Sequence, residues 1–203
     1  MNVHRPSRLL AFGTGTLTAT LLLTVCGSAG AQTQTSTSTA VAKGTATVAT
    51  AARSTVARCT TGELRATVQL QAAGSAMVIL ENKGGHTCTL FGYPGYRGLR
   101  ADNRPEALAV KRAPHPGPPE KVTLKPGTAA FAGLKWSACQ KSDRSCHVIS
   151  GLQLTPPDET KQLTAKVLGL DGKPVTQLTV SAAGLTTGSL QPVSQGVVFR
   201  PGS

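Results

Sequence analysis

Four cysteines behind an apolar leader limit the folds available to this sequence. They are Cys59, Cys88, Cys139 and Cys146. In an oxidising compartment, four cysteines form two disulfides, with three possible connectivities. We favour Cys59 with Cys88 and Cys139 with Cys146, because the last two are close in sequence, across a short polar loop. Such staples suit a domain whose core contains few aromatic residues, here 3% of the chain.

Residues 1–31 have the organisation of a secretory signal peptide. A basic start precedes residues 9–25, which are apolar or small and carry no charge. Ala29 and Ala31 offer the small side chains that a signal peptidase accepts, so the mature chain is predicted to begin at Gln32. The apolar run is short and contains glycine, so we expect no transmembrane helix in the mature chain. The predicted location is secreted or extracellular, with association to the cell wall as a variant.

An alternative interpretation makes Cys26 the lipidated N-terminus of a lipoprotein. Bacterial lipoprotein boxes place Gly, Ala or Ser directly before the cysteine, whereas this chain has Val25. We therefore favour loss of Cys26 with the leader. Residues 32–57 follow as a Ser/Thr/Ala-rich tract without aromatic residues, which predicts a disordered spacer. A single folded domain is then expected over residues 58–203.

The pattern of residues 58–203 is typical of an all-β domain. Short apolar or alternating runs are separated by Gly, Pro, Asn and Asp, and no long stretch keeps a helical period. We expect a single antiparallel β-sandwich of immunoglobulin-like type. The expected strands are residues 64–70, 76–80, 88–90, 97–100, 108–110, 121–124, 128–136, 146–154, 162–168, 175–180 and 196–199. The aromatic residues expected in the core are Phe91, Phe131, Trp136 and Phe199, while Tyr93, Tyr96 and Trp136 are candidate stacking faces for a sugar.

The chain is strongly basic, with 21 Lys and Arg against nine Asp and Glu and a formal net charge of +12. Such a field attracts polyanions of any chemistry, although a basic surface also serves simply for solubility. Nucleic acid is not an expected partner, because a reading helix and interleaved aromatic residues are both missing from the pattern. The candidate polyanion-contacting residues are Arg97, Arg100, Arg104, Lys111 and Arg112.

No motif for catalysis, cofactor binding or metal binding stands out. A Gly-x-Ser-x-Gly elbow and a phosphate-binding loop are both absent from the sequence. His115 lies in a Pro-rich loop where a solvated role is the default, and His86 lies in a turn where a polar filler is the default. No catalytic role is expected for these two or for His147. Cys139, Cys146 and His147 form the one ligand-like cluster, and export favours a disulfide there. We therefore predict no catalytic residue, no cofactor and no metal.

One run of residues is specific enough to indicate a family. It is Cys-Thr-Leu-Phe-Gly-Tyr-Pro-Gly at residues 88–95, supported by Cys59, residues 78–82, 122–127 and 134–136, and Cys146. On these residues the chain resembles the actinobacterial exported family DUF4232, a domain of unknown function, over residues 59–200. The resemblance implies a secreted or surface-attached β-sandwich and no assigned activity. Many relatives carry a further cysteine near the last strand, which this chain lacks after Cys146.

Three functions stay open from the sequence. The first is a non-enzymatic cell-envelope module that binds an anionic cell-wall polymer or another exported protein. The second is a small exported hydrolase with an unrecognised carboxylate and histidine site. The third is a structural spacer that binds nothing.

The predicted compartment and disulfides are directly testable. Exported protein, unfolded in denaturant and treated with a thiol reagent, is expected to show no free thiol, because all four cysteines of the mature chain are paired. Four reactive thiols in material collected outside the cell would contradict the prediction.

Overall fold

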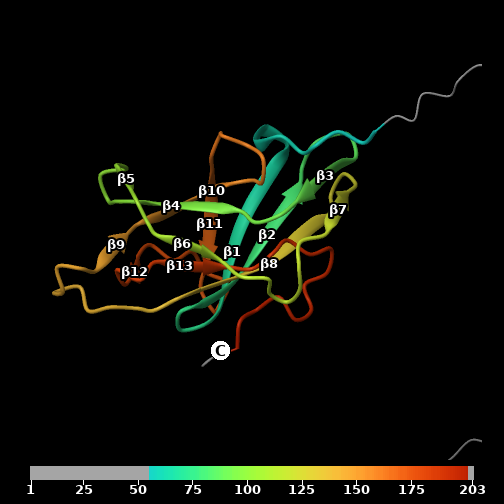
Figure 1. Cartoon of the computed structure of the whole chain (residues 1–203). Helices are drawn as coiled ribbons and strands as arrows, with labels where there is room; N and C mark the ends of the chain where they lie inside the picture. The colour runs from blue at the N-terminus through green and yellow to red at the C-terminus, as the bar shows by residue number, and fades with distance from the viewer. Residues whose placement is uncertain (1–54, 201–203) are drawn as a thin grey trace, which may run out of the picture. The chain divides into compact units, whose positions relative to one another are not determined.

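The computed structural model describes residues 55–200 (Figure 1). The predicted signal peptide of residues 1–31, Cys26 and nearly all of the predicted spacer lie outside the described residues. The described part is all-β, as the sequence pattern predicts, with one turn of 3-10 helix before the first strand. The elements are η1 (Thr61–Glu63), β1 (Leu64–Ala72), β2 (Ser75–Asn82), β3 (Cys88–Phe91), β4 (Gly95–Leu99), β5 (Pro105–Glu106), β6 (Val110–Arg112), β7 (Lys121–Leu124), β8 (Ala129–Trp136), β9 (His147–Ile149), β10 (Gly151–Thr155), β11 (Leu163–Leu168), β12 (Leu178–Val180) and β13 (Leu185–Thr187).

Nine of these strands form one large sheet in the order β5-β4-β10-β11-β1-β2-β8-β13-β6, and β12-β9 and β3-β7 form two small sheets. Most neighbours are antiparallel, but β1 runs parallel to β11 and β13 runs parallel to β6. The expectation of a purely antiparallel arrangement is therefore wrong at these two pairings. Both parallel pairings join strands that are far apart in sequence. A hairpin always gives antiparallel neighbours, whereas a long connection allows the second strand to run parallel to the first.

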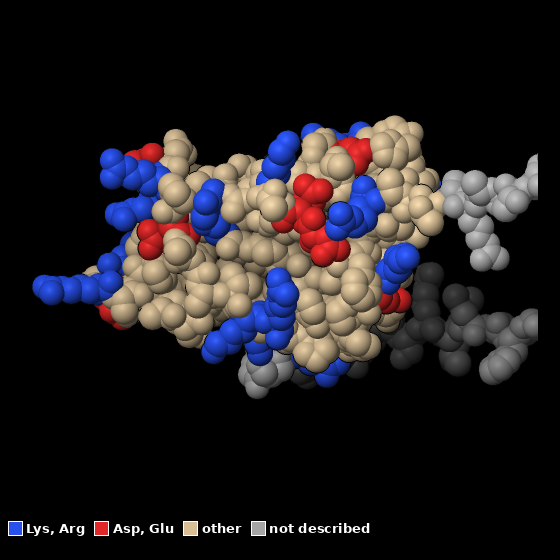
Figure 2. Space-filling view, turned by 45° about the horizontal axis from the view of Figure 1, so that its top comes forward, with Lys and Arg blue, Asp and Glu red and all other residues tan. Residues whose placement is uncertain are grey.

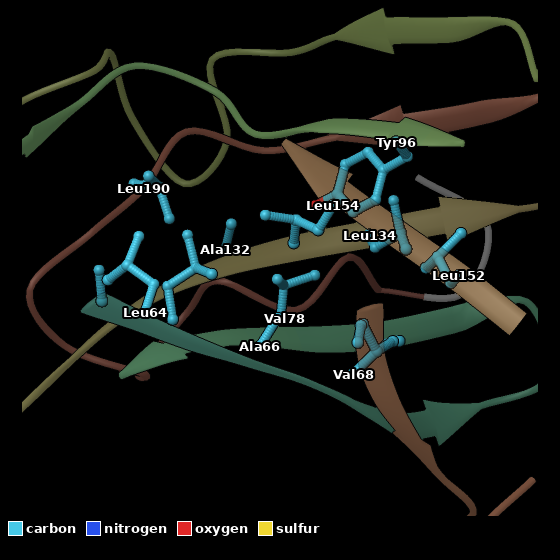
Figure 3. Packing of buried hydrophobic residues seen from close by; sticks show 14 of the residues in the cluster. Leu64, Ala66, Val68, Val78, Tyr96, Ala132, Leu134, Leu152, Leu154 and Leu190 are labelled. Atoms are coloured by element: carbon cyan, nitrogen blue, oxygen red, sulfur yellow. The ribbon is translucent and has the colours of Figure 1, made fainter. Parts of the chain in front are cut away.

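The large sheet is strongly curled, so that β4 and β10 cross over β1, β2 and β8 (Figure 1). Ala66 and Val68 of β1 and Val78 of β2 are at most 3% exposed. Their side chains point towards Tyr96 of β4 and Leu154 of β10, which lie on the other side of the core (Figure 3). The curled sheet thus encloses a mainly aliphatic core, and removal of this apolar surface from water is the main source of stability.

The core differs from the expected one in its aromatic residues. Phe91 is 55% exposed, so its assignment to the core is wrong. Tyr96 is buried instead of forming an exposed stacking face, and its hydroxyl oxygen lies 3.3 Å from that of Thr187. Burial raises the pKa of the Tyr96 phenol, and the contact with Thr187 opposes that rise. The other expected core aromatics are buried or partly buried: Phe131, Trp136 and Phe199.

The last part of the chain also differs from expectation. Residues 196–199 were expected to form a strand, but they are irregular, although Val197 and Phe199 are buried. The last strand is β13, which the sequence pattern did not reveal. Its three residues are too few to display an alternation, and Gly184 and Gly188 flank them. Tertiary pairing with β8 and β6, rather than local propensity, makes this segment a strand.

Two disulfides brace the domain with the pairing that the spacing favours. Cys59–Cys88 is buried and joins the segment before η1 to β3, where the Cys59 backbone N–H also donates to the Thr89 carbonyl oxygen at 3.0 Å. Cys139–Cys146 is partly exposed and closes the loop between β8 and β9. The first bridge anchors the entry into the folded domain, and the second restrains one surface loop.

The two bridges are expected to contribute unequally to stability. C59A/C88A is expected to lower the free energy of unfolding by about 3.5 kcal/mol and C139A/C146A by about 2.5 kcal/mol, because the longer loop constrains the unfolded chain more. The sequence separations are 29 and 7 residues. Chemical denaturation of the two double variants measures both losses. A larger loss for the Cys139–Cys146 bridge would contradict the prediction.

Candidate functional site

The five basic residues predicted to contact a polyanion do not form one cluster. Arg97, Arg100 and Arg104 lie in or directly after β4, where polar and acidic side chains engage them. The pairings are Arg97 Nη2 with Gln153 Oε1 at 2.9 Å and with Gln162, Arg100 Nη1 with Glu106 Oε2 at 3.7 Å, and Arg104 Nε with Asp102 Oδ2 at 3.4 Å. Lys111 and Arg112 lie on β6, which ends the opposite edge of the strand order. The Arg112 guanidinium carbon is 5.9 Å from the centroid of the Tyr93 ring.

The surface charge is correspondingly divided. On the face shown in Figure 2, basic side chains stand in separate groups, and acidic side chains lie beside several of them. Opposite charges within a few ångströms cancel most of each other's field at longer range. The high net charge therefore does not produce one continuous basic patch on this face.

A row of residues crosses four neighbouring strands on the outer face of the large sheet. Lys111 of β6 is paired with Thr186 of β13, Thr186 with Lys135 of β8, and Lys135 with Ser75 of β2. Directly paired residues project from the same face of a sheet. Since neighbouring Leu134 is 1% exposed and belongs to the core, the row points away from the core. The strand spacing places the backbones of Lys111 and Lys135 about 10 Å apart, with Thr186 between them.

This row lines a pocket of about 300 Å³. Lys111, Lys135 and Arg200 bring three cationic side chains to it, and the described residues that line it include no Asp or Glu. Thr186 and Ser137 add hydroxyl groups. The complete lining is Ala73, Gly74, Ser75, Lys111, Lys135, Trp136, Ser137, Ala183, Gly184, Thr186, Phe199 and Arg200. We call it the basic pocket; its cations and hydroxyl donors suit an anion that carries several oxygen atoms.

The C-terminal segment forms one wall of the basic pocket. The Ser75 hydroxyl donates to the Phe199 carbonyl oxygen at 3.1 Å, and the Lys135 Nζ lies 4.9 Å from the centroid of the Phe199 ring. A Cβ atom at Gly133 would lie 2.0 Å from the Val197 carbonyl oxygen, so only glycine lets the segment lie directly on β8. The absence of a side chain at this one position in β8 therefore allows the wall to form.

A second pocket, of about 460 Å³, contains a histidine and carboxylate pair. The His147 Nδ1 lies 2.7 Å from the Glu106 Oε1, and both side chains are partly buried. Arg100 and Arg144 also line this pocket, and so does Cys146 of the second disulfide. A carboxylate that accepts a hydrogen bond from Nδ1 orients the ring and leaves Nε2 as the second functional nitrogen. We call this the His147 pocket.

The other two histidines have structural surroundings. The His86 Nε2 lies 2.8 Å from a carboxylate oxygen of Glu63. Hydrogen bonds from the Thr60 backbone and hydroxyl, with a smaller contribution from His86, hold the pKa of the Glu63 carboxyl below its ordinary value. The His115 ring stacks on Phe199 with a centroid distance of 4.2 Å. Neither His86 nor His115 lines the basic pocket or the His147 pocket.

Sequence reasoning named two residues of the basic pocket as binding candidates, Lys111 and Trp136, and missed Lys135, Thr186 and Arg200. The alternation Leu134-Lys135 within an apolar run gave a local signal that Lys135 faces outward. The strand pairing that brings Lys135 next to Thr186 had no such signal. Basic residues that are close along the chain, Arg97 to Arg104, were grouped instead, although their neighbours in space engage them.

These features define an all-β, disulfide-braced domain with an outward-facing basic pocket. The chain belongs to the family described as a domain of unknown function, DUF4232, whose model matches residues 59–184. Thr186, Phe199 and Arg200 of the basic pocket lie after the matched residues. No curated protein and no solved structure matches the chain.

Two further findings concern the part of the chain that the structure describes. Over residues 55–200, no helix has the length and apolar character needed to cross a membrane. Among the same residues, His, Cys, Asp and Glu nowhere gather in threes with a geometry that would hold a metal ion. The cysteines of the cluster Cys139, Cys146 and His147 are joined to each other in a disulfide.

Proposed function

We propose that this chain is an exported, non-enzymatic module of the cell envelope that binds an anionic cell-wall polymer through its basic pocket. The observation that carries the proposal is that Lys111, Lys135 and Arg200 line one hollow whose described lining residues include no Asp or Glu. Three like charges around one hollow attract an anion of any chemistry.

The disulfides support the proposed location. Two bridges are compatible with an oxidising, extracellular compartment, and they agree with the secretory leader predicted from residues 1–31. We also propose that residues 32–57 act as a spacer between the leader and the domain. In this proposal the spacer lets the domain reach polymer at a distance from the membrane.

We further propose that the curled sheet and the small sheets together represent an immunoglobulin-like sandwich with an enlarged, mixed sheet. Packing of β1, β2 and β8 against β4 and β10 supports a two-layered description. In such sandwiches the outer faces and the loops are available for binding while the inner faces form the core. The outer position of the basic pocket fits that division.

A repeating polymer suits a pocket of this kind. A partly exposed contact between single charges contributes about 0.5–1 kcal/mol, so one repeat unit binds weakly. Many identical units on one chain raise the chance of rebinding, and several modules on the same polymer add avidity. The proposal thus needs only moderate affinity at each pocket. Binding to another exported protein or a purely structural role are the alternatives that the following experiment tests.

The first test is retention on immobilised anionic polymer. The protein is expected to bind polyglycerol phosphate, and K111Q/K135Q is expected to weaken binding by about tenfold, because two charge contacts of about 0.7 kcal/mol each are lost. Raised salt should weaken binding of the unmodified protein.

K121Q/K166Q is the matched control, since Lys121 and Lys166 are exposed lysines on β7 and β11, outside the basic pocket. If both double variants weaken binding to the polymer equally, the loss follows from the lower net charge alone. That result would contradict a role for the basic pocket. Absence of retention on any anionic polymer would favour a protein partner or a structural spacer.

A second candidate function, hydrolysis, is favoured by the His147 pocket. The Glu106 carboxylate next to Nδ1 would orient His147 as a general base, and Arg100 and Arg144 would stabilise a developing negative charge. In that reaction, a water molecule attacks an ester while His147 Nε2 takes its proton, and the same nitrogen then returns the proton to the leaving oxygen as the ester bond breaks. The Ser145 hydroxyl in the same pocket donates to Asp143 rather than serving as a nucleophile paired with His147.

This second candidate makes its own prediction. If the His147 pocket is catalytic, the protein hydrolyses chromogenic carboxyl or phosphate esters, and H147Q lowers kcat by about 100-fold or more, as expected for loss of a general base. H86Q is the matched control because it removes a histidine that also faces a glutamate, but outside this pocket. No turnover by the unmodified protein, or equal turnover by both variants, would remove the hydrolase hypothesis.

A further inference from the structure

We infer that the Cys139–Cys146 disulfide is a site of modification by small thiols. A thiol that enters the His147 pocket forms a mixed disulfide with Cys146, and the loop that opens then releases His147 from Glu106. The described residues that line the His147 pocket are all different from those of the basic pocket. The modification is therefore independent of polymer binding and goes beyond the proposed function.

The two disulfides differ in how far solvent reaches them. Cys59 and Cys88 are at most 1% exposed and belong to the hydrophobic core. Cys139 and Cys146 are both partly exposed, and residues 140–145 between them are exposed throughout. A thiolate attacks a disulfide by direct contact with one of its sulfur atoms, so access decides which bond exchanges. In this domain the surface bond is the one that a thiol reaches.

The His147 pocket gives a thiol access to one of the two bonded cysteines. Cys146 lines this hollow of about 460 Å³, and Cys139 is not among the described residues that line it. The hollow has the liquid volume of about fifteen water molecules, which is enough for a thiol with a few carbon atoms. The mixed disulfide is therefore expected on Cys146, with Cys139 as the leaving group.

The exchange proceeds in two balanced steps. The thiolate attacks the Cys146 Sγ, a new S–S bond forms, and the Cys139–Cys146 bond breaks. Its electron pair leaves with the Cys139 Sγ, which takes a proton from water. A second thiolate then attacks the outer sulfur atom of the mixed disulfide, so that Cys146 leaves as a thiolate and the two small thiols depart as one oxidised disulfide. If Cys139 attacks Cys146 instead, the original bridge is restored and the first thiol is set free.

Mainly local and exposed contacts hold the loop once the disulfide is open. The Asp143 N–H donates to the Gln140 carbonyl oxygen and the Cys146 N–H donates to the Asp143 carbonyl oxygen, each at 3.0 Å. A hydrogen bond from the Lys141 side chain to that of Gln177 joins the loop to the segment before β12, and both residues are exposed. Segments with few buried contacts open easily. The loop therefore gains freedom when the bridge is lost.

The new freedom ends shortly after the disulfide, in β9. Ile149 is 1% exposed in the core, and β9 pairs with β12. His147 begins β9 directly after Cys146, so it lies between the released loop and this anchor. Its Nδ1 lies 2.7 Å from the Oε1 of Glu106, which belongs to the two-residue strand β5 at the edge of the large sheet. Opening of the bridge thus acts on the contact between His147 and Glu106 while the core stays in place.

Mass spectrometry after treatment of the folded protein with 2-mercaptoethanol tests the selectivity. We expect Cys139–Cys146 to react about 100-fold faster than Cys59–Cys88, because the buried bond reacts only after the core opens locally. The same treatment in denaturant is the control, and there the difference should largely disappear. Similar rates for the two bonds in the folded protein would overturn the inference.

Digestion identifies the sulfur atom that the thiol attacks. Samples are quenched with acid, N-ethylmaleimide caps the thiol that left, and trypsin cuts after Lys141 and Arg144, between the two cysteines. We expect the mass of the small thiol on the Cys146 peptide and the mass of the maleimide on the Cys139 peptide. An equal or reversed distribution contradicts attack from the His147 pocket and overturns the inference.

NMR spectroscopy tests the release of His147. When only the surface bridge is reduced, the ring signals of His147 should move, and the backbone amides of residues 140–147 should exchange with solvent about tenfold faster. C139A/C146A imitates the open state permanently and should show the same changes. The His86 ring is the internal control, because it also faces a glutamate but lies outside the pocket. Unchanged His147 signals after reduction would overturn the inference, since the bridge would then not control this contact.

Discussion

The pairing of β13 between β6 and β8 determines which side chains the outer face of the sheet presents. In this register Leu185 and Thr187 point into the core, where Thr187 meets Tyr96, and Thr186 points outward between two lysines. A shift of one residue would exchange the two faces of the strand. It would bury Thr186 and expose Leu185 and Thr187. Because burial of Leu185 and Thr187 sets the register of β13, it also sets the position of Thr186 between Lys111 and Lys135.

The same constraint connects stability with the proposed function. The C-terminal segment lies on β8 at Gly133 and contributes Phe199 to the wall and Arg200 to the lining. Phe199 is buried although it does not belong to a strand, so the segment is held by packing and by the hydrogen bond from Ser75. The charged groups of the pocket are thereby supported by the fold itself.

The sequence was sufficient for the class of fold, and among three possible connectivities it favoured the disulfide pairing that the structure shows. Short apolar or alternating runs marked β1, β2, β7 and β8, and the short spacing of Cys139 and Cys146 favoured their bond. It was insufficient where distant segments meet. The parallel pairings β1-β11 and β6-β13, the three-residue strand β13 and the burial of Val197 and Phe199 in an irregular segment all depend on tertiary contacts. The pocket depends on them as well, since Lys111, Lys135, Thr186 and Arg200 come from four separate segments.

NMR spectroscopy of the backbone amides during a titration with a short polyglycerol phosphate tests the assignment of the binding site most directly. The account predicts that the signals of Ser75, Lys111, Lys135 and Thr186 shift together and saturate at one ligand concentration. Signals of Arg97, Arg104 and Lys166 should stay in place. Small shifts spread over all basic residues without saturation would contradict the account, because they would mean that charge alone, and not the row across the four strands, attracts the anion.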